Sequence, residues 1–184
     1  MIRCDWANSS ELMKKYHDTE WGIPVHDERK LFEFLILEGA QAGLSWASVL
    51  KRREGYIKAF MSFRPEIVAK FDEKKINELM SESGIIRNRL KILSSINNSK
   101  CFLKVAQEFG SFDSYIWKFT NHKTISSNFD KISNIPARTP ESERMSEDLR
   151  KRGFSFVGPT ICYAFMQATG MANDHLVKCF KKKN

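Results

Sequence analysis

The sequence has no hydrophobic run of the roughly 20 residues that a membrane-spanning helix needs, and its first residues, MIRCDWANSS, contain no signal-peptide core. We therefore expect a cytoplasmic protein with no membrane contact. Cysteine is also scarce, because the four thiols at positions 4, 101, 162 and 179 are too few and too scattered for a secreted disulfide scaffold. In a reducing cell they are expected to be free thiols or metal ligands.

A sustained alternation of apolar and polar residues, which would indicate strands, is absent, as are internal repeats and low-complexity segments. Apolar residues recur instead at helical spacing. A compact all-α single domain covering residues 1–184 is therefore predicted, with more than half of its residues in helices. Helices are expected at 11–17, 28 to about 41, 46–63, 65–70, 73–83, from 89 with an interruption considered at 97–98, 101–110, 112–121, 141–153 and 160–170. The expected N-caps are Asp27, Ser45, Asp72 and Ser111.

Acidic residues are outnumbered, since 30 Lys and Arg against 22 Asp and Glu leave a net charge of +8. This balance favours polyanionic partners through long-range attraction and counterion release, and nucleic acid is the leading candidate. The alternative is that the excess charge only keeps the protein in solution.

Glu38 lies in the most apolar stretch of the chain, LFEFLILEGAQAGLSWASVL, at residues 31–50. A buried carboxylate is costly, and proteins retain one mainly when it is paired, protonated or used. Small residues from Gly39 to Gly43 leave space beside it, and Trp46 supplies a flat ring. This combination indicates a pocket for a flat polar ligand. The alternative is a hydrated core glutamate at a helix end.

Two cysteines and two histidines near the chain ends form a complete tetrahedral donor set for zinc: Cys4, His17, His175 and Cys179. The last two are four positions apart, which on a helix would put them on one face. Such a site would be structural, because four protein ligands leave no open position, and it would tie the termini together. The alternative is two exposed histidines and two ordinary cysteines.

The segment SGIIRNRLK places Gly84 in a turn and three cations, Arg87, Arg89 and Lys91, around the next helix start. Free backbone N–H groups at a helix N-terminus bind phosphate, so a helix-hairpin-helix unit that grips a nucleic-acid backbone is predicted. A solvated basic helix start is the alternative.

Taken together, the segments RCDW, YHDTEWG, LILEGAQAGLSW, SGIIRNRLK, RGFSFVGPTICYAFMQATG and NDHLVKC resemble the bacterial 3-methyladenine DNA glycosylase I family over essentially the whole chain. The resemblance implies a helix-hairpin-helix glycosylase fold with one structural Zn²⁺ on the four Cys and His ligands. It makes Glu38 the catalytic-pocket carboxylate, Tyr16 and Trp46 the base-stacking residues and Trp6 a pocket wall. Gly43 and Leu44 would form a wedge at the DNA, and Gly84, Arg87 and Arg89 would hold phosphates.

The activity implied by this resemblance is base excision repair on alkylated double-stranded DNA. A monomeric, monofunctional enzyme would flip 3-methyladenine into the pocket and hydrolyse its N-glycosidic bond without cleaving the strand. Whether Glu38 acts as a general base or only recognises the base stays open at this point. A non-enzymatic DNA-binding protein and a catalytic zinc hydrolase are the competing interpretations, the latter disfavoured by four protein ligands.

Overall fold

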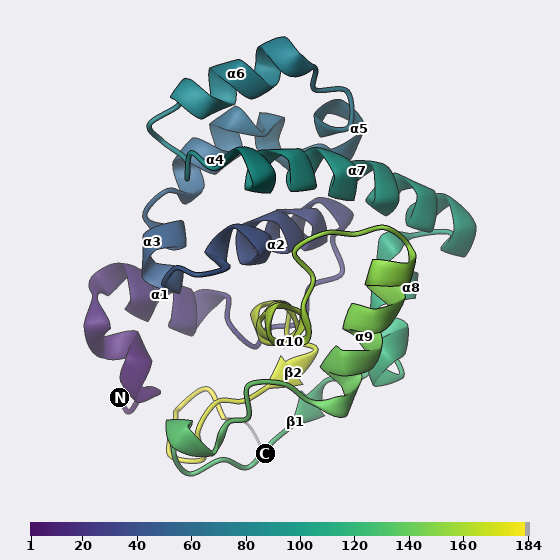
Figure 1. Cartoon of the computed structure of the whole chain (residues 1–184). Coiled ribbons are helices and arrows are strands. Elements are labelled where there is room, and N and C mark those ends of the chain that lie inside the picture. Colours follow the sequence, from purple (N-terminus) through teal and green to yellow (C-terminus); the bar gives the residue numbers. More distant parts are fainter. Residues whose placement is uncertain (183–184) are drawn as a thin grey trace.

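Helix α2 (Glu28–Gln41) packs between α7 (Arg89–Phe109) and α10 (Pro159–Ala168), and the other helices surround these three (Figure 1). The structure is a computed structural model that describes residues 1–182; Lys183 and Asn184 lie outside the described residues. Asp27 caps α2 by accepting a hydrogen bond from the N–H of Lys30, as predicted. Every residue from 31 to 40 is buried, so this helix is enclosed on all sides and carries Glu38 into the core.

The N-terminal segment forms the short helix η1 (Asp5–Ser9) and then α1 (Glu11–Thr19). Ser10 caps α1 through its side chain, which accepts from the N–H of Met13. The buried residues of α1 are Met13, Tyr16 and His17, at the three- and four-residue spacing of one helical face. This face is therefore turned toward the interior, and two of the predicted site residues lie on it.

The single helix predicted for residues 46–63 is wrong, because the chain forms three pieces there: α3 (Trp46–Leu50), α4 (Arg53–Ala59) and η2 (Met61–Phe63). Arg53, the first residue of α4, forms ion pairs with Glu20 and Glu33. Both partners are distant in the sequence, so the local residue pattern does not predict these contacts. Two short helices follow, α5 (Pro65–Val68) and α6 (Glu73–Ser81), and Asp72 caps the second.

Helix α7 continues without interruption from Arg89 to Phe109, so the break considered at Asn97 and Asn98 does not occur. The amide of Asn98 donates to the carbonyl oxygen of Ser155 at 2.9 Å and accepts from the Ser155 N–H at 2.8 Å. Asn97 donates to the carbonyl oxygen of Gly153. Both side chains bond a distant loop instead of competing with their own helix backbone.

The C-terminal half contains α8 (Phe112–Trp117), η3 (Lys118–Thr120), η4 (Ile132–Asn134), α9 (Pro140–Lys151) and α10. Two short strands, β1 (Ile125–Ser126) and β2 (Ala172–Asn173), pair in parallel with Ile125 opposite Ala172. The predicted all-α class is otherwise correct, since the fold is a compact single domain that is 61% helical. Among the described residues, no helix is both long and apolar enough to cross a membrane.

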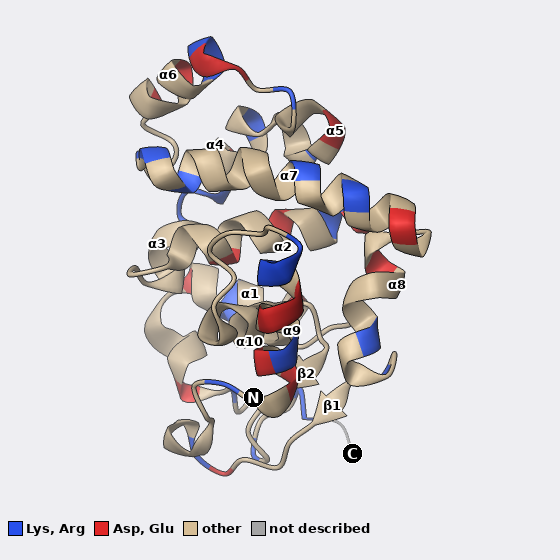
Figure 2. Cartoon of the chain, turned by 45° about the vertical axis from the view of Figure 1, so that its right-hand side comes forward, with Lys and Arg blue, Asp and Glu red and all other residues tan. Residues whose placement is uncertain are grey.

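The surface of α9 carries charges of both signs (Figure 2). They pair along the helix: Arg144 with Glu141, and Lys151 with Glu147. This helix therefore presents no continuous positive surface that could attract a polyanion.

Candidate active site and metal centre

A cavity of about 400 Å³ opens between α1, α2, α3, α10 and the segment around η4. The four residues predicted to bind substrate all line it, although they come from four different helices, η1, α1, α2 and α3: Trp6, Tyr16, Glu38 and Trp46. The cavity is also lined by Met13, Trp21, Gln41, Ile132, Ile135, Ala164 and Gln167. Its walls are mainly aromatic and aliphatic with few polar groups, which is typical of a small-molecule site.

Glu38 is 3% exposed, and its Oε2 atom has no hydrogen-bond partner among the described residues. Burial raises the pKa of this carboxyl group from 4.5 to about 8, because a charge would be poorly solvated there. Glu33, the second acid of the same helix, differs: it accepts from Arg53 Nε at 2.6 Å. Of the two buried acids of α2, Glu38 is the one left for a ligand.

Aromatic rings surround the carboxyl group. The ring centroids of Tyr16 and Trp46 are 5.3 Å apart, those of Trp6 and Tyr16 6.3 Å, and those of Trp6 and Trp21 5.1 Å. The pKa of Tyr16 is raised, first by burial and then by the negative charge of Glu38. The indole Nε1 of Trp46 is buried without a partner among the described residues. The cavity therefore offers ring faces together with unsatisfied polar atoms.

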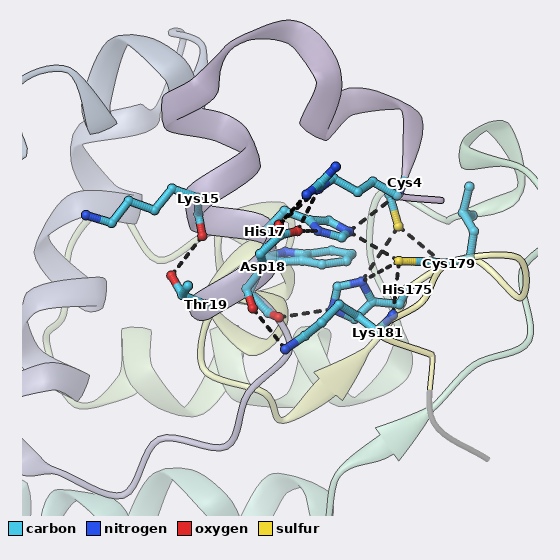
Figure 3. A network of polar contacts seen from close by, with 11 residues as sticks. Cys4, Lys15, His17, Asp18, Thr19, His175, Cys179 and Lys181 are labelled. Carbon is cyan, nitrogen blue, oxygen red and sulfur yellow. Dashed lines mark hydrogen bonds and ion pairs between the residues drawn. The ribbon is translucent and has the colours of Figure 1, made fainter. Parts of the chain in front are cut away.

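Behind this aromatic wall lies the predicted metal set, Cys4, His17, His175 and Cys179, whose ligand atoms all lie within 4.8 Å of one another (Figure 3). All four residues are buried. The distances between sulfur and facing nitrogen atoms are 3.4 to 3.7 Å. Tetrahedral zinc bonds of ordinary length would place such atoms about 3.5 Å apart. The donor set and its spacing therefore fit zinc.

The second ring nitrogen of each histidine is also bound. His17 Nδ1 lies 2.8 Å from Asp18 Oδ1, and His175 Nε2 lies 3.1 Å from the carbonyl oxygen of Trp21 (Figure 3). These oxygens accept hydrogen bonds, so the lone pairs remain on His17 Nε2 and His175 Nδ1, the atoms that face the thiols. Burial lowers the pKa of His17 and lowers that of His175 to about 4. Both imidazoles are thus neutral, as metal ligation requires.

Cys4, directly before η1, and His17 on α1 come from one end of the chain, and His175 and Cys179 come from the turn after β2 at the other. His175 and Cys179 lie in this turn and not on a helix, which is a correction to the helical spacing considered for them. The turn still brings their Nδ1 and Sγ atoms to 3.5 Å. The ring of Trp6, a cavity residue, lies 5.3 Å from that of His17. The cluster therefore supports one wall of the cavity.

The predicted hairpin at Gly84 packs closely against α4. A Cβ atom on Gly55 would lie 2.1 Å from the carbonyl oxygen of Gly84, so only glycine fits there. The Gly84 N–H donates to Glu82 Oε1 at 2.8 Å and is already engaged. Arg89 pairs with Glu73, whereas Arg87 is exposed and has no ion pair among the described residues.

Lys91, grouped with these cations in the sequence, points inward. It is 8% exposed, and its Nζ donates to the carbonyl oxygens of Ala40 and Ala42 at 2.8 and 2.7 Å. The basic face of the hairpin therefore consists of Arg87 and Arg89 without Lys91. Gly43, with φ of +76°, and Leu44, 44% exposed, follow directly where α2 ends.

Comparison with known proteins identifies the family of this chain. Residues 6–182 match the family model of methyladenine glycosylase. The chain belongs to the methyladenine glycosylase family. It is similar to DNA-3-methyladenine glycosylase 1 of Escherichia coli (strain K12), with 46% identity over 179 residues that cover 97% of this chain and 96% of the relative.

Solved structures show the same fold. A crystal structure of 3-methyladenine DNA glycosylase I is 44% identical and covers 99% of this chain and 100% of its own, with a TM-score of 0.96. A variant of a 3-methyladenine DNA glycosylase I in complex with 3-methyladenine is 33% identical, with a TM-score of 0.95 over 100% of this chain and 99% of that chain.

In this member of the methyladenine glycosylase family, the sequence-based prediction missed part of the cavity wall. Trp21 lies in the YHDTEWG segment and could have been found by its nearness to Tyr16. Gln167 is a polar residue in a mostly apolar helix, and this contrast could have marked it as a candidate site residue. Ile132 and Ile135 come from a segment that the sequence indicates only as an irregular connection. No local pattern could have placed them at the cavity.

Proposed function

We propose that this protein hydrolyses the N-glycosidic bond of 3-methyladenine in alkylated double-stranded DNA, as a monomer whose single glycosylase domain covers residues 1–184. The observation that carries the proposal is the buried, unpaired carboxyl group of Glu38 in an aromatic cavity, in a chain of the methyladenine glycosylase family. The relative with 3-methyladenine bound supports the choice of base.

The reaction begins when the damaged nucleotide leaves the duplex and enters the cavity. Unstacking and unpairing cost a few kcal/mol, less for a damaged base, and stacking against the rings of Tyr16 and Trp46 offsets this cost. Methylation at N3 places a positive charge on adenine in DNA. The base therefore leaves as a neutral purine, and no strong acid is needed to protonate it.

Glu38 selects the charged base in this proposal. The carboxyl group is neutral in the free protein at pH 7, since burial holds its pKa at about 8. An entering cation favours its ionised form, so the desolvated carboxylate gains more from the cationic lesion than from neutral adenine. Glu38 also accepts a hydrogen bond from the exocyclic amino group. We assign it this recognition role, with direct contact to the leaving base.

Water attacks the sugar C1′ atom as the bond to the base breaks. No lysine is among the described residues that line the cavity, so no amine is positioned there to form a Schiff base with the sugar. The proposed enzyme is accordingly monofunctional and leaves an intact strand with an abasic site. Gly43 and Leu44 would occupy the gap that the flipped base leaves. Gly84, Arg87 and Arg89 would contact the phosphates.

The four buried Cys and His residues would hold one structural Zn²⁺, through the thiolates of Cys4 and Cys179, His17 Nε2 and His175 Nδ1. The ion would supply a tetrahedral cross-link between the two ends of the chain and no open position for water. The histidines also support the cavity, because the cavity residues Trp6 and Trp21 pack against their rings.

The test is to incubate methylated DNA with the protein and separate the released bases by chromatography. The proposal expects release of free 3-methyladenine without strand cleavage, insensitive to brief treatment with a chelator. Glu38→Gln should abolish most of this release, while Glu66→Gln, at a surface acid on α5, should not change it. DNA binding without base release would instead favour a non-enzymatic DNA-binding protein. Activity lost at once on chelation would favour a catalytic metal.

A further inference from the structure

A buried polar network lies behind the cavity and has no part in the reaction described so far. Asp174, fully buried after β2, accepts two hydrogen bonds at Oδ2: from the Tyr163 hydroxyl at 2.5 Å and from Gln167 Nε2 at 2.8 Å. Tyr163 and Gln167 are one turn apart on α10. Only Gln167 also lines the cavity. The network therefore ends in an amide group at the proposed base site.

The partners of Gln167 determine which way its amide group faces. A carboxylate oxygen that takes a hydrogen bond from an amide requires its NH₂ group, so Nε2 faces Asp174 and the carbonyl Oε1 is at the other end. Oε1 has no hydrogen-bond partner among the described residues, and the side chain is half-buried. Ala164, one turn earlier, lines the same cavity, so this face of α10 forms its wall.

The backbone at this position is held as well. The carbonyl oxygen of Gln167 accepts a hydrogen bond from the N–H of Gly22 at 2.9 Å, next to the cavity residue Trp21. The amide therefore has a fixed backbone and a fixed donor end. Its carbonyl oxygen is the part left to meet a ligand.

We propose that Gln167 is a second base-recognition residue, whose Oε1 accepts a hydrogen bond from the exocyclic amino group of the extruded adenine. The inference rests on the proposed function and names a determinant of its specificity. An amino group carries two N–H bonds, and Glu38 and Gln167 supply one acceptor for each. Asp174 is a positioning residue, because it keeps the amide from turning its NH₂ group toward the base.

The arrangement discriminates between purines. Guanine carries a carbonyl oxygen where adenine carries the amino group, so Gln167 Oε1 would face another acceptor and leave both groups unsatisfied. A buried polar group left without a hydrogen bond loses more binding free energy than a satisfied hydrogen bond contributes. Gln167 therefore selects 3-methyladenine over 3-methylguanine, a choice that stacking alone cannot make, since both bases have similar ring faces.

The test measures binding of the two free bases, 3-methyladenine and 3-methylguanine, to Gln167→Met and to wild type by titration calorimetry. Methionine keeps the length of the side chain and removes the acceptor. The dissociation constant for 3-methyladenine should rise about fivefold to tenfold, the worth of one hydrogen bond, while that for 3-methylguanine stays unchanged or falls. The ratio of the two constants is the decisive quantity, because a purely structural defect would weaken both bases alike.

Gln107→Met serves as the matched control, since Gln107 is exposed on α7 and away from the cavity. Its base ratio should equal that of wild type. An unchanged ratio in Gln167→Met, or equal loss of both bases, overturns the assignment of Gln167. That result leaves the proposed function standing as long as wild type releases 3-methyladenine from methylated DNA. Failure of wild type to release it would overturn the proposed function itself.

Discussion

Lys91 Nζ donates a hydrogen bond to the carbonyl oxygen of Ala40 at 2.8 Å and so joins the start of α7 to the end of α2. The same ammonium group holds the carbonyl oxygen of Ala42 at 2.7 Å. Carbonyl groups at a helix C-terminus lack partners within the helix, and a cation there satisfies them. This contact connects the hairpin to the segment of Gly43 and Leu44. In the proposed enzyme, those are the two parts that meet DNA.

Replacing Lys91 by methionine keeps the length of the side chain and removes the charge. We expect the free energy of unfolding to fall by about 2 kcal/mol, because hydrogen bonds to a charged group are lost. Excision from duplex DNA should fall more than binding of free 3-methyladenine, since the cavity is left intact. Denaturant unfolding and base release would be measured. An equal loss of excision and free-base binding would contradict this role.

Removal of the metal ligand Cys179 should cost both metal and stability. Cys179→Ser is expected to purify without zinc and to melt several degrees lower, since ~1 kcal/mol corresponds to about 2–4 °C in a domain of this size. Zinc content by atomic absorption and thermal melting provide the check. Cys101→Ser is the matched control, because Cys101 is also buried but lies outside the cluster. Equal zinc content in Cys179→Ser and wild type would rule the site out.

The raised pKa of Glu38 predicts how stability depends on pH. An unfolded glutamate releases its proton near 4.5, whereas folded Glu38 keeps it up to about pH 8. Between these values the folded state binds more protons than the unfolded state, so the free energy of unfolding falls as pH rises. Glu38→Gln removes this contribution.

Wild type should therefore lose stability relative to Glu38→Gln from about pH 5 to about pH 8, and the difference should level off above that range. Denaturant unfolding at a series of pH values measures it, with Glu66→Gln as a surface control. Parallel stability curves for wild type and Glu38→Gln would show that the carboxyl group is not desolvated as described.

Leu44 offers a test of the wedge. Its side chain is 44% exposed, so Leu44→Ala should change stability by less than about 0.5 kcal/mol. We expect excision from duplex DNA to fall about tenfold, because the gap left by the flipped base is no longer filled, while free-base binding stays constant. Leu12→Ala, at an exposed leucine of α1, should leave both unchanged. Full activity of Leu44→Ala on duplex DNA would exclude the wedge.

Arg87 tests the phosphate contact. It has no ion pair among residues 1–182, unlike Arg89, which pairs with Glu73. Arg87→Ala should weaken DNA binding irrespective of sequence and reduce the slope of log K against log salt concentration by about 0.9, the effect of one phosphate contact. Fluorescence anisotropy over a range of salt concentrations measures the slope. A slope equal to that of wild type would place Arg87 away from the DNA.

Much of the local structure could be predicted from the sequence because its causes are local. Asp27, Ser45, Asp72 and Ser111 all cap helices as expected, since each side chain bonds a backbone N–H three residues ahead. The four Cys and His residues could be grouped by donor chemistry alone, and the structure brings their ligand atoms together. The zinc ion itself stays a prediction.

Other features depended on partners far away in the sequence. Asn97 and Asn98 looked like helix breakers, but the loop at 153–155 receives their amide groups and the helix continues. Lys91 was placed with the outward cations, yet two carbonyl groups of α2 draw it inside. Such contacts leave no periodic or compositional signal, so sequence reasoning could not find them.

Glu33 and Glu38 separate what could be predicted from the sequence from what depends on the tertiary structure. The sequence by itself determined that the carboxyl group of Glu38 would lie in an apolar helix, that rings and small residues would lie near it, and that a tetrahedral donor set was available. Only the tertiary structure decided that Arg53 neutralises Glu33 while Glu38 remains unpaired in a cavity. The physical reason is that the state of a buried charge depends on the groups packed around it, and these come from distant parts of the chain.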